Sequence, residues 1–122
     1  MKHFNPEEYF DTPYSEFCVE KYVETKGYLY LVQDKAFPGF VKVGRTNDMQ
    51  ARLTSYNKDK PYPTTYPLCI SRLFTDVLAA EKKVLDYLYK VTEPTTFRKE
   101  WFRDEHTDLI LKVLEAAEKQ LE

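Results

Sequence analysis

Hydrophobic and polar positions along the chain follow two different spacings, and the change of spacing predicts strands followed by helices. Residues 27–32 and 40–44 are rich in β-branched and aromatic side chains, which favours two strands. The connection over residues 34–39 is too short for a parallel crossover, so these strands should form an antiparallel hairpin. A third strand is expected over residues 68–74, after a loop at residues 57–67 that contains three prolines.

Helical spacing begins after the hairpin and returns twice more along the chain. Asn47 or Asp48 can cap the first helix with a side-chain oxygen, and Asp76 can cap the second. The third helix carries its apolar residues on one stripe, as expected of a helix that packs on a domain. These helices are expected at residues 48–56, 76–90 and 107–121. The order of elements predicts an α+β fold, with a small three-stranded antiparallel sheet flanked by helices.

Charge divides the chain into three parts, although the net charge is only -2. Residues 1–26 hold three lysines against six acids, residues 27–72 hold seven cations against three acids, and residues 73–122 hold eight against eleven. A short helix is expected from Ser15 within the acidic start. We therefore expect an acidic N-terminal extension, a central core and an amphipathic C-terminal helix, at residues 1–26, 27–104 and 105–122.

Length and composition exclude several classes of protein. A chain of 122 residues is long enough for one domain and too short for two. No apolar run is long enough to span a membrane, and acids with Pro6 stand where a signal peptide would be apolar, so we expect a cytoplasmic protein without membrane contact. Cys18 and Cys69 lack the spacing of a zinc site.

Two charged residues interrupt apolar helical stripes. Glu81 lies in the middle of a stripe formed by Val77, Val84, Leu85 and Leu88. Arg52 shares a face with Met49, Leu53 and Tyr56. Burying an ionised group costs several kcal/mol unless it is paired or binds a cation. Glu81 could therefore reach the edge of its stripe, pair with a nearby arginine such as Arg52, or bind a metal ion.

Two residues of the expected hairpin could also belong to a site. Tyr30 shares one strand face with Tyr28, and Lys42 interrupts the apolar alternation of the second strand. They lie on the same face if paired residue numbers add to an even number, which the sequence leaves open. Partly exposed packing is the simpler explanation for each residue taken singly.

Taken together, these positions resemble the GIY-YIG nuclease superfamily over residues 27–102. Tyr28-Leu29-Tyr30 matches the first motif, and Lys42-Val43-Gly44 matches the second, with lysine in place of its tyrosine. Arg52 matches the family's arginine, and Tyr56 matches its histidine or tyrosine. Glu81 matches the family's glutamate, and Glu100-Trp101-Phe102 matches its closing motif.

The resemblance implies a metal-dependent endonuclease that hydrolyses DNA phosphodiester bonds. It implies that Glu81 holds one Mg²⁺ or Mn²⁺ ion, whose other positions water and phosphate oxygens would fill. Tyr30 would activate or position the attacking water, as a phenolate if Lys42 lowers its pKa. Arg52 would hold a phosphate oxygen and Tyr56 would orient the water or the phosphate. The expected contacts to the DNA backbone are Arg45, Thr46, Lys58 and Lys60.

Two other functions remain open at this point. Lys42 and the acidic balance suit a catalytically weakened fold that binds nucleic acid or protein. An interaction protein whose acidic ends mask or mimic a charged surface is the other alternative. Because the chain has little net positive charge, DNA binding should be weak and sensitive to salt, and a protein partner could assist it.

Overall fold

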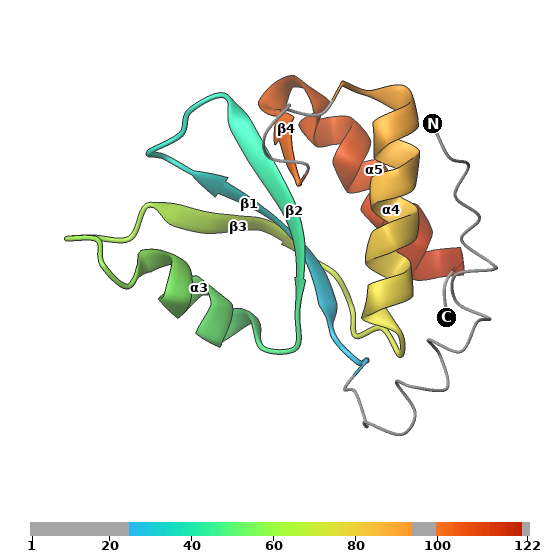
Figure 1. The fold of residues 1–122 in the computed structure, drawn as a ribbon, viewed down its shortest axis with the longest axis horizontal. Helices are drawn as coiled ribbons and strands as arrows, with labels where there is room; N and C mark the ends of the chain where they lie inside the picture. Colours follow the sequence, from blue (N-terminus) through green and yellow to red (C-terminus); the bar gives the residue numbers. More distant parts are fainter. Residues whose placement is uncertain (1–24, 94–99, 121–122) are drawn as a thin grey trace, which may run out of the picture.

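The computed structural model describes residues 25–93 and 100–120, which form an antiparallel sheet and three α-helices. The strands are β1 (Tyr28–Asp34), β2 (Phe40–Thr46), β3 (Thr65–Ile70) and β4 (Trp101–Arg103). The helices are α3 (Met49–Asn57), α4 (Val77–Val91) and α5 (Thr107–Gln120), and a 3₁₀ turn, Asp104–His106, leads into α5. The expected α+β fold is confirmed (Figure 1). The helix expected from Ser15 lies outside the described residues.

The sheet has four strands in the order β3-β1-β2-β4, not the three expected. β4 has three residues, of which Trp101 pairs with Lys42 and Phe102 with Val41. A strand this short has no recognisable alternation, and its stability depends on pairing with β2. The pairing matters because it brings the Glu100-Trp101-Phe102 segment beside the second half of the hairpin.

The third strand also differs from its expected range. β3 begins at Thr65, inside the expected loop, and ends at Ile70. Proline is tolerated in β3 because it is an edge strand, and Pro67 lies at the irregularity where the pairing with β1 shifts. Phe74, expected in the strand, instead forms an isolated bridge with Gly27.

The helix caps agree with the sequence prediction. The Asp48 side chain accepts a hydrogen bond from Ala51 N at 3.0 Å, and Asp76 accepts one from Ala79 N at 3.1 Å. Each carboxylate satisfies a backbone donor that the first turn of a helix leaves without a partner. The two caps fix where α3 and α4 begin, and these helices carry three of the expected site residues.

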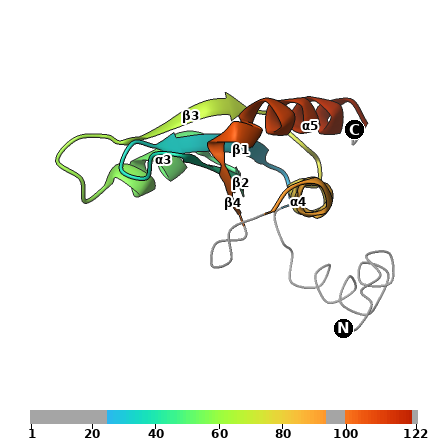
Figure 2. The same ribbon diagram turned by 90° about the horizontal axis from the view of Figure 1, so that it is seen from above.

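The hydrophobic core lies on one face of the sheet. Alternate residues of the hairpin point into it, including Leu29, Leu31, Val41 and Val43, which are fully buried. α4 and α5 cover this face with residues from their apolar stripes, namely Val77, Ala80, Val84, Leu88, Ile110, Leu114 and Ala117. α3 lies apart from these two helices (Figure 2). Among the described residues, no helix has the length and apolarity to cross a membrane.

Candidate functional site

The hairpin register places Tyr30 and Lys42 on the same face of the sheet. Tyr30 pairs with Gly44 and Val32 pairs with Lys42, so paired residue numbers add to an even number. Side chains two residues apart on a strand share a face, and directly opposed residues point the same way. This face is opposite to the one that carries the core, and α3 supplies Tyr56 to it.

Tyr30 is buried with its ring lying across Gly44. A Cβ atom at Gly44 would overlap the Tyr30 ring, so the absence of a side chain there makes room for the tyrosine. The Tyr30 hydroxyl lies 2.7 Å from the Tyr56 hydroxyl. Burial raises the pKa of Tyr30, and the hydrogen bond with Tyr56 raises it further. The expectation of a lowered pKa at Tyr30 is therefore wrong for this structure, in which the phenol is neutral.

Lys42 contacts Tyr56 and not Tyr30. Its ammonium donates a hydrogen bond to the Tyr56 hydroxyl at 2.9 Å and lies 5.0 Å from the centre of the Tyr56 ring. The same ammonium lies 6.0 Å from the centre of the Trp101 ring. A continuous chain of contacts therefore runs from the buried Tyr30 hydroxyl through Tyr56 to the half-buried Lys42 ammonium.

Glu81 is held by an arginine that the sequence did not suggest as its partner. Its side chain is 13% exposed, and Oε1 lies 3.3 Å from Nη1 of Arg45. The Arg52–Glu81 pair considered from the sequence is replaced by Arg45, which projects from β2 toward α4. Oε2 of Glu81 is buried and has no hydrogen-bond partner among the described residues. This oxygen remains available to a ligand.

The charges around Glu81 act in both directions. Burial raises its pKa, Arg45 lowers it, Glu100 raises it, and Lys42 and Arg52 lower it, with a raised pKa as the net result. Because Lys42 and Arg52 act on Glu81, the carboxylate lies within electrostatic range of the face that carries the tyrosines. Arg45 shares a strand face with the core residues Val41 and Val43, so the Arg45–Glu81 pair and the tyrosines are reached from opposite faces of β2.

Arg52 is exposed, so the expectation of an inward arginine is wrong. α3 has no buried residue, and its apolar side is only partly covered. The Arg52 charge nevertheless lowers the pKa of both Tyr30 and Glu81, although larger contributions outweigh it. Arg52 therefore lies at the rim of the site, where an arginine is free to meet a phosphate.

The four expected DNA-backbone residues have different environments. Arg45 and Lys58 are exposed, although Arg45 also pairs with Glu81. Thr46 is buried, and its hydroxyl bonds to the backbone of Asp48 in the turn before α3. Lys60 binds the buried carboxylate of Asp34 at 2.9 Å. Thr46 and Lys60 therefore stabilise the fold in this structure, and Arg45 and Lys58 are the two placed to meet a ligand.

Two residues of the site had no role assigned from the sequence. The Glu100 carboxylate raises the pKa of Tyr30, Glu81 and Tyr89, so its charge acts on the same region. Trp101 lies opposite Lys42 in the sheet. Their only signal in the sequence was the closing motif, which gave no position in space.

The donor set around Glu81 fits a hard cation such as Mg²⁺ or Mn²⁺. The unpartnered Oε2 is a carboxylate oxygen, the ligand type that such cations prefer. Residues 25–93 and 100–120 hold no cluster of three or more potential metal-binding side chains. A cation at Glu81 would therefore take most of its ligands from water and from phosphate oxygens.

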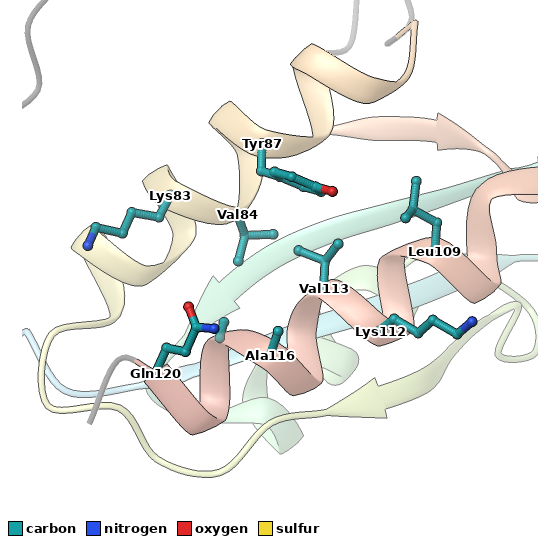
Figure 3. A pocket seen from close by; sticks show the side chains of 9 residues that line it. Lys83, Val84, Tyr87, Leu109, Lys112, Val113, Ala116 and Gln120 are labelled. Atoms are coloured by element: carbon teal, nitrogen blue, oxygen red, sulfur yellow. The ribbon is translucent and has the colours of Figure 1, made fainter.

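A separate groove of about 480 Å³ lies between α4 and α5. Figure 3 shows its lining, which includes Lys83, Val84 and Tyr87 of α4 and Leu109, Lys112 and Val113 of α5. None of the expected site residues lines it. The groove is therefore distinct from the site at β2. The Tyr87 side chain in its lining is exposed.

A match to a family of nuclease-like domains covers most of this chain. The chain belongs to the T5orf172 domain family, whose profile matches residues 27–118. This family supports a nuclease-like or DNA-binding role for the chain. Searches of the curated proteins and of the solved structures found no match.

Proposed function

We propose that this chain is a GIY-YIG-type endonuclease that uses Mg²⁺ or Mn²⁺ to hydrolyse DNA phosphodiester bonds. The observation that carries the proposal is the hydrogen-bonded chain from Tyr30 through Tyr56 to Lys42, whose charge acts on Glu81. Glu81 also has a buried oxygen with no hydrogen-bond partner among the described residues. These groups match what hydrolysis requires: a positioned water, stabilisation of phosphoryl charge and a ligand for a cation.

The contacts support a different role for each of the two tyrosine hydroxyls. Tyr56 is the more exposed of the two tyrosines, and its hydroxyl would hold the attacking water by a hydrogen bond. Tyr30 fixes the orientation of that hydroxyl from its buried position, and remains protonated because burial raises its pKa. Tyr30 is therefore a positioning residue in this proposal, and not the base that removes the proton from water.

Cationic side chains would stabilise the phosphate. Arg52 at the rim can hold a nonbridging oxygen with its planar guanidinium, and Lys42 can stabilise negative charge beside the Tyr56 hydroxyl. Arg45 holds Glu81 with one N–H group and has further donors for the DNA backbone. A Mg²⁺ or Mn²⁺ ion held by Glu81 would supply Lewis-acid stabilisation of the phosphoryl group.

The proposal is tested by cleavage of supercoiled plasmid, with Mg²⁺ or Mn²⁺ and with EDTA. We expect the wild type to nick the plasmid only with the cation, and Glu81→Gln to lose about 100-fold or more in rate because the metal ligand is gone. Glu115→Gln is the matched control, since Glu115 is an exposed residue of α5 paired with Lys119. It should cleave like the wild type.

Thermal melting of the same variants separates catalysis from stability. Glu81→Gln should melt at or above the wild-type temperature, because it removes a carboxylate whose charge burial disfavours. A large loss of stability would mean that the Arg45–Glu81 pair is structural. Undiminished cleavage by Glu81→Gln would contradict the metal-binding role.

A DNA-binding module without hydrolytic activity is the second candidate. The neutral, buried Tyr30 and the ion pair that occupies Oε1 of Glu81 favour it, because both leave the site less reactive. DNA binding by the folded wild type, with no nicking in either cation, would support this candidate over the endonuclease.

A further inference from the structure

Two aromatic rings extend the site toward the tip of the hairpin. Phe37 lies in the turn between β1 and β2, and its side chain is 58% exposed. Its ring centre is 6.1 Å from that of Trp101, with the ring planes at 69°. Large apolar side chains are usually covered by other parts of a protein, so an exposed ring held against a second ring marks a candidate binding surface.

This aromatic pair is continuous with the proposed catalytic groups. Lys42 lies within 6.0 Å of the Trp101 ring centre and donates a hydrogen bond to the Tyr56 hydroxyl at 2.9 Å. Trp101 is directly opposite Lys42 in the sheet, so its ring lies on the same face as Tyr30. A ligand that reaches Tyr56 and Lys42 therefore lies close to the Trp101 ring, which in turn contacts Phe37.

Other aromatic and cationic side chains lie at the same end of the sheet, although Tyr66, opposite Gln33 in β1, points to the other face. Lys35 donates a backbone hydrogen bond to Thr64 O at 2.9 Å, which joins the hairpin turn to the loop before β3. Both turns lie at one end of the sheet in Figure 1. The Lys35 ammonium lies 4.9 Å from the ring centre of Tyr66 in β3, which is 41% exposed. Tyr62, in the loop before β3, is 68% exposed.

We propose that Phe37 and Trp101 form a stacking platform for unpaired DNA bases next to the phosphate held at Tyr56. Exposed rings beside lysines are the elements with which proteins bind single strands, since every base has a face that can stack. In a duplex those faces are covered by neighbouring bases. The inference rests on the proposed function, and it names the substrate as DNA with an unpaired segment at the cleavage site.

Trp101 itself reports on the stacking, because it is the one tryptophan of the chain. In EDTA, which prevents cleavage, the full-length protein is titrated with a flapped duplex and with a fully paired duplex of equal nucleotide number. We expect the flapped DNA to quench the tryptophan fluorescence and to bind more tightly. The paired duplex should bind with little quenching.

Phe37→Ala tests the platform without touching the core. We expect it to weaken binding of the flapped DNA by about tenfold, with a smaller effect on the paired duplex. Tyr87→Ala removes an exposed ring of α4 that lines the other groove, and should leave both affinities unchanged. The loss caused by Phe37→Ala should be the same at low and high salt, because stacking releases no counterions.

Equal affinities of the wild type and Phe37→Ala for the flapped DNA, with unchanged tryptophan fluorescence, would overturn the inference. That result would leave the endonuclease proposal standing if the plasmid is still nicked with Mg²⁺ or Mn²⁺. If flapped DNA quenches the tryptophan fluorescence but the protein never nicks the plasmid, the stacking platform is supported and the endonuclease proposal is not. The protein is then a binding module.

Discussion

Tyr56 connects the buried and exposed parts of the site. Its hydroxyl lies 2.7 Å from the Tyr30 hydroxyl and 2.9 Å from the Lys42 ammonium. Because Lys42 only donates, the Tyr56 oxygen must accept from it, and one of the two phenols donates to the other. Removing the Tyr56 hydroxyl would leave the hydroxyl of Tyr30, which is 1% exposed, without this partner.

Tyr56→Phe should therefore lower the free energy of unfolding by about 1–3 kcal/mol, the cost of an unsatisfied buried polar group. Adding Tyr30→Phe to this variant should restore part of the loss, because the second hydroxyl no longer needs a partner. Urea unfolding of the two single variants and the double variant measures the coupling. Strictly additive losses would show that the two hydroxyls do not depend on each other.

Single residues also show what the sequence could and could not indicate about the site. The position of Glu81 within an apolar stripe correctly indicated a largely buried carboxylate, since helix spacing decides which face a residue occupies. Its partner could not be derived in this way. Arg45 lies in β2 and Arg52 in the helix that follows it, and only the three-dimensional placement of β2 against α4 selects Arg45.

Among the elements, β1, β3 and the loop between α3 and β3 are joined by a polar cluster around Asp34. Lys60 Nζ at 2.9 Å and Thr65 Oγ1 at 3.1 Å donate to Oδ2 of Asp34, and Ala36 N donates to Oδ1 at 2.9 Å. Burial alone would raise the pKa of Asp34, but these hydrogen bonds outweigh it and lower the pKa from 3.8 to about 2. The ionised carboxylate therefore stabilises the folded protein.

Asp34→Asn should lower the free energy of unfolding by about 2 kcal/mol at pH 7. Because the folded-state pKa is depressed, this stabilisation is present above pH 3.8 and is lost as the pH falls toward about 2. Urea unfolding of the wild type and the variant at pH 7 and at pH 2 measures the loss of stability at each pH. Asp59→Asn is the control, because Asp59 is an exposed residue of the α3–β3 loop. An equal loss at both pH values would indicate packing instead of charge.

The elements that the sequence predicted best are those with local signals. The hairpin, the two aspartate caps and the stripe of α5 depend on residues near one another in the chain. β4 and the start of β3 depend on partners far away in sequence, since Trp101 pairs with Lys42 and Thr65 with Asp34. Pairing of this kind has no local pattern, so a three-residue strand could not be predicted.

At the scale of the whole molecule, opposite charges are carried by different parts of the chain. Residues 27–72 have a net charge of +4, from seven cations and three acids, and include Lys42, Arg45 and Arg52. Residues 1–14 hold one lysine and three acids. Thr25, where the described chain begins, accepts a hydrogen bond from Val77 N at 2.8 Å, so the chain enters the domain at the start of α4, the helix that carries Glu81.

Deleting residues 1–14 should therefore strengthen DNA binding, because a tethered acidic segment competes with phosphate for the same cations. A gain of roughly two- to fivefold is expected at low salt, the size of a few exposed ion pairs, and it should vanish at high salt as screening increases. Fluorescence anisotropy over a salt series measures the affinity. The full-length variant with Glu7→Gln, Glu8→Gln and Asp11→Asn is the control for length, and should reproduce the gain. An affinity equal to that of the wild type at every salt concentration would rule out electrostatic competition by this segment.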